Sequence, residues 1–403
     1  MPIAGSSGVS SDAVIIPKIA HFRELGNAFW RWIRLAVAHD LSIWEGMGHV
    51  KLFIPGPVEV SKKTFEAFCH PMLGHRSKDF QELYASIQPR LREAFYTSRP
   101  VYLSTSSAWG VMEAAIRNLV RGKVLNCMSG AFSDKWHDVS LRCGKQAVKC
   151  QVEWGKPITG ALVDQHLAEG GFDAVTLIHN ETSTGTMNPL ADVAAAVRRH
   201  PGVLLIVDTV SSFSVLPIEP EKHGVDVMLT GSQKALALPP GMALFTLSQR
   251  ALDRAAEVSG RGYYFDFLEF HANAEKNMTI STPSIGHIHA LKSKIEEIFE
   301  EGLENRYARH RRNNAMVRAW AKDRGFELFP EPGFESLSLT CIRNNRGLDM
   351  PAVTKAMREK HSFQMDGGYG KLKGQTFRIS NMGDETEETM GEFLRALDDV
   401  IGS

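Results

Sequence analysis

Between about residues 100 and 250 the sequence alternates between short apolar runs and amphipathic stretches, and this alternation constrains the fold more than any other feature. Stretches with helical periodicity, at 109–120, 133–143, 161–168 and 190–199, separate most of the apolar runs. Near-continuous apolar strands joined by helices are typical of a mostly parallel sheet covered on both faces. We therefore predict an α/β fold with a seven-stranded sheet. Its strands are expected at 101–104, 124–128, 147–152, 174–179, 203–208, 225–230 and 242–247.

The chain on either side of this region predicts four parts. Residues 1–18 are small and polar, which predicts a disordered tail, and residues 19–45 have a helical period, which predicts an N-terminal helical extension. Its charges are mixed in sign, so packing on the body or on a partner subunit is favoured over contact with a membrane. We expect a large domain over 46–290. A long linking helix and a small α+β domain are expected over 291–403.

The charge balance and the cysteines exclude several classes of protein. Lys+Arg and Asp+Glu number 46 each, so no net field attracts nucleic acid or an anionic membrane. The five cysteines are odd in number and lack CxxC spacing, which indicates a reducing compartment with neither a disulfide framework nor a zinc site. No apolar run reaches the roughly 18 residues of a membrane span. We expect a cytoplasmic protein without a metal.

Polar and aromatic residues follow the predicted strands where ligands bind in open α/β sheets, beyond the carboxyl ends. STSSAWG (104–110) opens a helix at about Trp109, and the free N–H groups of a helix start favour a phosphate. Phe132 follows the second strand, and Thr182 lies in the polar loop after the fourth. Asp208 closes a five-residue apolar run, so burial is costly unless the carboxylate pairs with a cation.

Lys234 lies in GSQKALALPPG (231–241), where a buried strand ends and an apolar loop begins. This position suits an amine that is partly desolvated, has a lowered pKa and can form a Schiff base. A phosphate cradle, a flat ring, a hydroxyl, a carboxylate and this lysine at one sheet edge match the needs of pyridoxal 5′-phosphate. The carboxylate would keep the pyridine nitrogen protonated, so that the ring acts as an electron sink.

The order of motifs resembles the class V aminotransferases of PLP fold type I, in particular the alanine/serine–glyoxylate (pyruvate) aminotransferase group. The resemblance spans about 50 to 400. The matching segments are FIPGPVEVS (53–61), GHRSKDF (74–80), STSSAWGVMEAA (104–115), HNETSTG (179–185), IVDTVSS (206–212), GSQKALALPPG (231–241), STPSIGHIHAL (281–291) and FRIS (377–380).

The resemblance implies a role for each matching residue. Lys234 would be the Schiff-base lysine and Asp208 the partner of the pyridine nitrogen. Phe132 would stack on the ring, Thr182 would bond the ring hydroxyl, and Arg378 would bind the substrate carboxylate. The strand pattern alone leaves a solvent-facing Arg378 as an equal alternative. Further cofactor contacts are implied for Ser107, Ala108, Trp109, Val210 and Gln233, and for Thr279 and Thr282 from the other subunit of a homodimer.

The expected activity is transfer of an amino group from alanine or serine to glyoxylate or pyruvate by a ping-pong scheme. A 2-aminoethylphosphonate-type transaminase and a PLP lyase or desulfurase on the same fold stay open as alternatives, as does a non-catalytic binding protein. A desulfurase needs a mobile nucleophilic cysteine, and Cys341 is instead predicted to be a buried strand residue. The sequence does not separate the amino donors or the acceptors.

Overall fold

The computed structural model describes residues 48–402, so the predicted tail 1–18 and helical extension 19–45 lie outside the described residues. All seven predicted strands form one sheet in the order β2-β10-β9-β8-β5-β3-β4. The strands run parallel except β10, which is antiparallel to both β2 and β9. Their bounds are β2 (Tyr102–Ser104), β3 (Lys123–Met128), β4 (Gln146–Gln151), β5 (Ala174–Ile178), β8 (Leu204–Asp208), β9 (Val227–Gly231) and β10 (Ala243–Leu247). The prediction of a mostly parallel seven-stranded sheet is confirmed.

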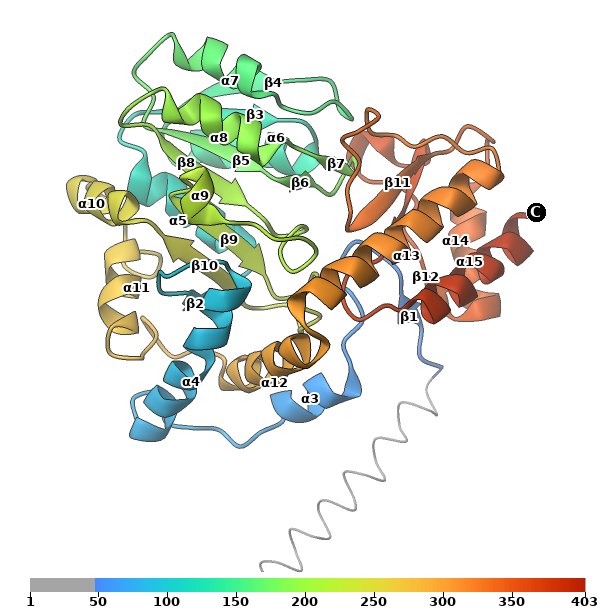
Figure 1. Ribbon diagram of the computed structural model, residues 1–403, viewed down its shortest axis with the longest axis horizontal. Helices are drawn as coiled ribbons and strands as arrows, with labels where there is room; N and C mark the ends of the chain where they lie inside the picture. Colours follow the sequence, from blue (N-terminus) through green and yellow to red (C-terminus); the bar gives the residue numbers. More distant parts are fainter. Residues whose placement is uncertain (1–47, 403) are drawn as a thin grey trace, which may run out of the picture. The chain divides into compact units, whose positions relative to one another are not determined.

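The helices that cover the sheet form because their apolar positions recur at helical spacing. Helix α5 contacts β8, β9 and β10, and α6 contacts β3, β4 and β5, while α7 packs on α8 (Figure 1). Strands β5, β8 and β9 are buried along their whole length, as expected for strands covered on both faces. The bounds are α4 (Lys78–Ala94), α5 (Ala108–Leu119), α6 (Ala131–Arg142), α7 (Gly160–Leu167), α8 (Leu190–Arg198), α9 (Pro220–His223), α10 (Gln249–Glu257) and α11 (Phe267–Ala274).

The C-terminal part has a separate apolar core, to which Phe53, Trp320, Phe377 and Phe393 contribute. Its elements lie together in orange and red in Figure 1. They are α13 (Leu303–Asp323), β11 (Leu339–Arg343), α14 (Met350–His361), β12 (Phe363–Gln364), the 3-10 turn η1 (Gly370–Leu372), β13 (Thr376–Ser380) and α15 (Glu387–Ile401). Strands β11 and β13 pair antiparallel, as the predicted small α+β domain requires. The domain boundary near residue 290 stays a prediction.

The predicted long linking helix is wrong as a single helix. The structure has two helices there, α12 (Ile285–Glu301) and α13, which meet at Gly302. Gly302 has a φ of +84°, which a helix cannot continue through and which residues with a Cβ seldom adopt.

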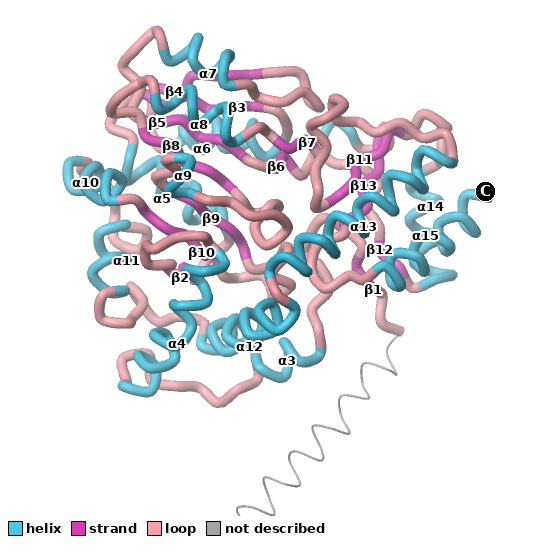
Figure 2. The backbone as a smooth tube through the Cα atoms, in the orientation of Figure 1, coloured by secondary structure: helices cyan, strands magenta, loops and turns pink. Residues whose placement is uncertain are grey.

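Short elements connect the two cores. They are β1 (Lys51–Leu52), α3 (Lys62–Phe68), β6 (Asn180–Glu181) and β7 (Thr186–Met187). Strand β1 pairs with β12, so residues 51–52 belong to the small C-terminal part although they precede the sheet in the sequence. The loops that follow β8 and β9, drawn in pink in Figure 2, lie beside α13, where Arg306 donates to Ser214 Oγ and to the carbonyl of Ala235. Within residues 48–402, no helix combines the length and apolar composition needed to cross a bilayer.

Candidate active site

The ends of the central strands meet at a cavity of about 380 Å³. It collects most of the residues that the sequence predicts for the site, from loops that follow β2, β3, β5, β8 and β9. The cavity is lined by Gly56, Pro57, Ser107, Ala108, Trp109, Met112, Phe132, Ile178, Asn180, Thr182, Asp208, Val210, Ser211, Gln233, Lys234, Pro240 and Tyr369. Of the predicted residues, Arg378, Thr279 and Thr282 do not line it.

Lys234 is held almost out of water in the loop after β9, with only 9% of the residue exposed. Its amine donates a hydrogen bond to the carbonyl of Pro55, and a Cβ at position 56 would lie only 2.9 Å from Nζ. Gly56, with a φ of +117°, therefore permits this close approach. Burial, and secondly the charge of Arg378, lowers the pKa of Lys234 to about 8. An amine with this pKa is partly neutral, and so nucleophilic, near neutral pH.

Asp208 ends β8 and is 6% exposed. Burial raises the pKa of Asp208 to about 7, although a 2.6 Å hydrogen bond from the Val210 N–H acts in the opposite direction. The nearby Lys234 charge also lowers this pKa, but by less than burial raises it. Among the described residues, no cation forms an ion pair with Asp208 within 4.0 Å. A carboxyl in this state would gain most from a cationic or protonated ligand group.

The start of α5 has no side-chain capping bond among the described residues. Ser107 is the N-cap of this helix, but its hydroxyl accepts no capping bond from the first turn. The first turn of a helix carries free N–H groups and the positive end of the helix dipole, which favour a phosphate. Gln233 lies at the same cavity, and its buried Oε1 has no partner within the described chain.

Asn180 supplies a second buried amide with an unused oxygen at the cavity. Its Nδ2 donates to Ser338 Oγ at 2.8 Å, whereas Oδ1 lacks a partner within the described part. Buried polar atoms without partners are costly in a folded protein, so two at one cavity indicate a ligand with polar groups. These amides, the open helix start, Lys234 and Asp208 together fit pyridoxal 5′-phosphate.

Phe132 and Thr182 both line the cavity. Phe132 is in the first turn of α6, whose start is fixed by the buried carboxylate of Glu181, which accepts the Ser133 N–H at 3.0 Å. The ring of Phe132 stacks on Tyr369, with centroids 5.1 Å apart and an interplanar angle of 18°. The Thr182 hydroxyl shares a 2.6 Å hydrogen bond with Ser211.

Arg378 on β13 is 3% exposed, so the solvent-facing alternative for this residue is wrong. Its Nε and Nη2 donate to the two carboxylate oxygens of Asp366, both at 2.8 Å. Its Nη1 donates to the carbonyl of Thr182, also at 2.8 Å. Through Thr182, the small C-terminal part therefore contacts a residue that lines the cavity.

Thr279 and Thr282 lie between α11 and α12 and outside the cavity of their own chain. The Thr279 hydroxyl donates to the carbonyl of Ser281 at 2.7 Å. Their predicted contact with a cofactor requires a second subunit and stays a prediction.

Cys341 is buried in β11, as its sequence pattern predicts, and is only 1% exposed. Burial raises the pKa of its thiol to about 12. A thiol in this environment is a poor nucleophile, so the desulfurase alternative loses its one candidate residue.

The sequence interpretation did not single out Gly56, Asn180, Asp366 or Tyr369. Asn180 stands in the quoted loop HNETSTG, directly after the residue that follows β5. Asp366 and Tyr369 belong to the glycine-rich loop DGGYGKLKG (366–374), whose glycines signal a turn but not what it contacts.

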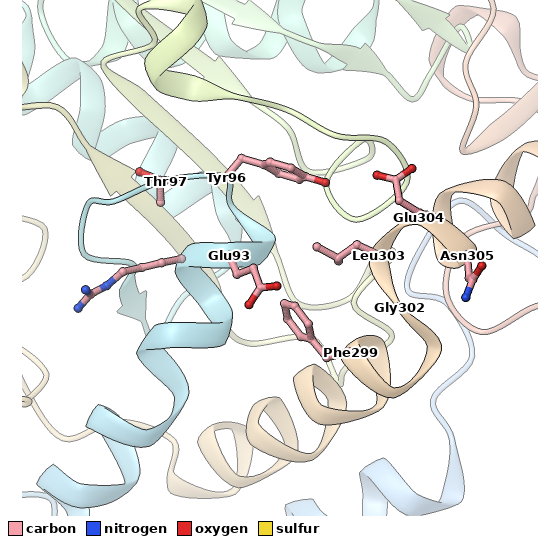
Figure 3. A pocket seen from close by; sticks show the side chains of 9 residues that line it. Glu93, Tyr96, Thr97, Phe299, Gly302, Leu303, Glu304 and Asn305 are labelled. Carbon is pink, nitrogen blue, oxygen red and sulfur yellow. The ribbon is translucent and has the colours of Figure 1, made fainter.

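A larger hollow of about 640 Å³ lies elsewhere, between the end of α4 and the junction of α12 and α13 (Figure 3). Glu93 and Tyr96 border it on one side, and Phe299, Leu303 and Glu304 on the other. None of the predicted site residues lines it, and the described chain offers no group of three or more metal-ligating side chains here or elsewhere. Most of the residues predicted for the site therefore gather at the cavity at the strand ends and not at this hollow.

Comparison with known proteins agrees with this geometry. The family model for aminotransferase class-V matches residues 65–343. The L-aspartate–glyoxylate aminotransferase of Paracoccus denitrificans is 32% identical over 345 residues, which cover 83% of this chain and 87% of the relative. The serine–glyoxylate aminotransferase of Hyphomicrobium methylovorum is 33% identical over 359 residues, covering 86% and 88%.

Among solved structures, an alanine–glyoxylate aminotransferase from Nostoc sp. superposes with a TM-score of 0.83 at 29% identity. The match covers 88% of this chain and 95% of that one. Since the family model alone spans more than half of the residues, the chain belongs to the class-V aminotransferases, a family of enzymes that use pyridoxal 5′-phosphate.

Proposed function

We propose that the protein moves an amino group from a small amino acid, alanine or serine, to a small 2-oxo acid, glyoxylate or pyruvate, by a ping-pong scheme. The observation that carries this proposal is the burial of Lys234 and Asp208 at one cavity, with opposite shifts that bring their pKa values to about 8 and about 7. Paired titratable groups shifted in this way are typical of sites that transfer protons.

In this proposal the residues of the cavity hold the cofactor from several sides. Lys234 would bind it covalently, Asp208 would face its ring nitrogen, and the start of α5 with Gln233 would bind its phosphate. Phe132 would cover one ring face, and Thr182 would reach the ring hydroxyl. When bound, the cofactor supplies an electron sink for the carbon that loses its proton.

The proton transfer falls to the Nζ of Lys234. Its lowered pKa leaves part of the amine neutral, so Nζ can accept the α-proton of the amino acid and later return it. The carbonyl of Pro55 and the backbone of Gly56 limit where Nζ can move. Arg378, behind Thr182, would hold the substrate carboxylate and so orient the α-carbon.

The walls of the cavity support a small substrate with an uncharged side chain. Trp109, Met112, Ile178 and Pro240 are apolar, and the only charged side chains that line the cavity in the described chain are Asp208 and Lys234. The names of the relatives pair glyoxylate with aspartate, serine or alanine as the donor. Glyoxylate is therefore the acceptor that the comparisons favour.

We also propose a homodimer in which Thr279 and Thr282 contact the cofactor of the other subunit. Both residues lie outside the cavity of their own chain, which supports a role across a subunit boundary. Mixing Lys234→Ala chains with Thr279→Ala/Thr282→Ala chains should then restore activity, because some heterodimers contain one intact composite site. An active monomer at micromolar concentration would contradict the composite site.

We propose that the protein works in the reducing environment of the cytoplasm, because its cysteines are unpaired. All five are free, including Cys127 and Cys150, which face each other on β3 and β4 without a disulfide. Such unpaired thiols are typical of reducing compartments.

The transaminase proposal is tested by a panel of donors and acceptors on the purified, cofactor-loaded protein. Alanine, serine and aspartate are each paired with glyoxylate and with pyruvate, and 2-aminoethylphosphonate is added as the alternative donor. We expect turnover with alanine or serine and glyoxylate. Turnover with 2-aminoethylphosphonate alone would favour the phosphonate alternative, and release of a side-chain fragment without an acceptor would favour a lyase.

A further inference from the structure

Asp366 occupies one edge of the Arg378 guanidinium in a two-bond fork. Its carboxylate oxygens accept the Nε and Nη2 donors of Arg378, and each bond is 2.8 Å long. Parallel bonds of this kind fix the plane and the direction of a guanidinium as well as its charge. The arginine that the proposed function assigns to the substrate carboxylate is thus held by a carboxylate of its own chain.

Asp366 is itself fixed on both its main chain and its side chain. Its carbonyl accepts the Arg378 N–H at 3.0 Å, so the two residues also pair through their backbones. Its Oδ1 accepts the Gly368 N–H at 2.9 Å, which closes the turn that begins the loop 366–374. The carboxylate therefore cannot follow a moving guanidinium without breaking the turn.

Arg378 has two donors that no described residue accepts, one on each terminal nitrogen, and this pair is called the second fork. A guanidinium has one donor on Nε and two on each terminal nitrogen. Asp366 takes Nε and one donor of Nη2, and the Thr182 carbonyl takes one donor of Nη1. One donor is left on each terminal nitrogen, and such a pair matches the two oxygens of a second carboxylate.

The loop that carries Asp366 also borders the cavity. Tyr369 lines the cavity, and its ring centroid lies 5.2 Å from the guanidinium carbon of Arg378. The other side of the loop is tied down by Lys371, whose amine lies 4.0 Å from the ring centroid of Trp154. Asp366 and Arg378 therefore do not line the cavity themselves but contact Thr182 and Tyr369, which do.

We propose that Asp366 is a positioning residue, which holds Arg378 from one edge so that its second fork faces the substrate carboxylate. This inference rests on the proposed function.

The position of Asp366 also narrows the substrate class, because the charge of Asp366 offsets that of Arg378. A substrate with a second carboxylate would bring like charges together next to Asp366, and Lys234 is the only cation that lines the cavity in the described residues. Amino acids with one carboxylate are therefore favoured over dicarboxylic ones.

The first test compares Asp366→Asn with the wild type in steady-state kinetics. Asparagine keeps the size but not the charge or the second acceptor, so we expect KM to rise about tenfold for both alanine and glyoxylate, with kcat within about twofold. The preference for serine over aspartate should fall about tenfold, since the repulsion of the second carboxylate is also removed. Asp366→Glu keeps the charge but not the geometry, and it should raise KM while retaining the preference.

Asp349→Asn is the matched control, because Asp349 is an aspartate of the same part of the chain that caps α14 and does not contact Arg378. Asparagine also caps helices, so its kinetics should match the wild type. A fall of KM in Asp366→Asn would mean that Asp366 only blocks Arg378 until substrate displaces it, and this would overturn the proposal. An unchanged KM would overturn it as well.

A binding measurement separates this inference from the proposed function. Propionate and succinate are alanine and aspartate without the amino group, so calorimetric titration of the cofactor-loaded protein requires no turnover. We expect propionate to bind the wild type more tightly than succinate and to lose about tenfold in affinity in Asp366→Asn. If this holds while the panel of amino acids shows no transamination, the proposed function fails and the role of Asp366 stands. Equal binding of propionate to both proteins, or none to either, would refute that role.

Discussion

Two cation–carboxylate pairs lie near the cavity, and the protein treats them differently. Lys234 and Asp208, at the ends of β9 and β8, form no ion pair within the described residues, and burial brings their pKa values to about 8 and about 7. Arg378 and Asp366, in the small C-terminal part, form a two-bond ion pair with both contacts at 2.8 Å. The first two side chains are not ion-paired within the described residues, whereas the second two are ion-paired before any substrate binds.

The difference follows from what each side chain can do when it is buried. A lysine or an aspartate can lose its charge through a pKa shift, and a group near its titration point can bind a cofactor and move a proton. An arginine cannot be deprotonated in a protein, so a buried guanidinium needs a permanent partner. The first pair is therefore suited to chemistry, and the second is suited to holding a substrate in one orientation.

The largest effect is expected from Lys234→Ala. Because no other amine lines the cavity in the described chain, this change should remove both turnover and the absorbance of the covalently bound cofactor. Absorbance spectra and a turnover assay of the purified variant check this. Lys222→Ala, which alters an exposed surface lysine, is the control and should behave as the wild type. Appreciable turnover in Lys234→Ala would show that the pair of Lys234 and Asp208 does not carry the chemistry.

The next largest effect is expected from Asp208→Asn. The variant should keep the cofactor, but the rate of α-proton removal should fall by several orders of magnitude. A neutral amide no longer holds a proton on the ring nitrogen. Rapid-mixing measurements of the half-reaction with alanine report this rate. Asp226→Asn is the control. Asp226 is a buried aspartate that accepts a hydrogen bond from the Leu205 N–H and lies outside the cavity. A loss in Asp208→Asn below about tenfold, or ~1.4 kcal/mol, would reduce Asp208 to a structural residue.

Arg378→Lys tests the other pair and should have a smaller effect. Lysine keeps the charge but loses both forks. The transition-state stabilisation calculated from kcat/KM should therefore fall by about 2–4 kcal/mol, while the cofactor content stays unchanged. KM should rise for donor and acceptor alike, because both carry the same carboxylate. Steady-state kinetics with both substrates measure this. Kinetics close to the wild type would show that another group holds the carboxylate.

The smallest effect is a shift along the pH axis. The pKa of Lys234 is lowered to about 8, so its amine becomes neutral as the pH rises through 8, and cofactor capture by the cofactor-free protein should accelerate until it levels off above that pH. Since the charge of Asp208 raises the pKa of Lys234, Asp208→Asn should move the midpoint to lower pH. Stopped-flow capture rates between pH 6 and 10 test this, and a midpoint near 10 would mean that Lys234 is not desolvated.

The two pairs also differ in how well sequence reasoning found them. Lys234 and Asp208 follow continuous apolar runs, so strand periodicity alone brings them to one sheet edge. Arg378 could be predicted only through the family resemblance, because its strand pattern leaves either orientation open. The contact of Asp366 with Arg378 could not be predicted. A glycine-rich loop separates the two residues, and its path depends on tertiary contacts. The break at Gly302 was missed because a glycine within a helical pattern is often tolerated.

We propose that the buried Lys234 amine holds the cofactor, and chemical reduction of the bound cofactor can locate the lysine that carries it. The cofactor-loaded protein is treated with sodium borohydride and digested, and mass spectrometry locates the lysine that carries the reduced cofactor. We expect the label on Lys234, in the peptide that contains GSQKALALPPG. A label on another lysine, or bound cofactor that leaves Lys234 unlabelled, would contradict it.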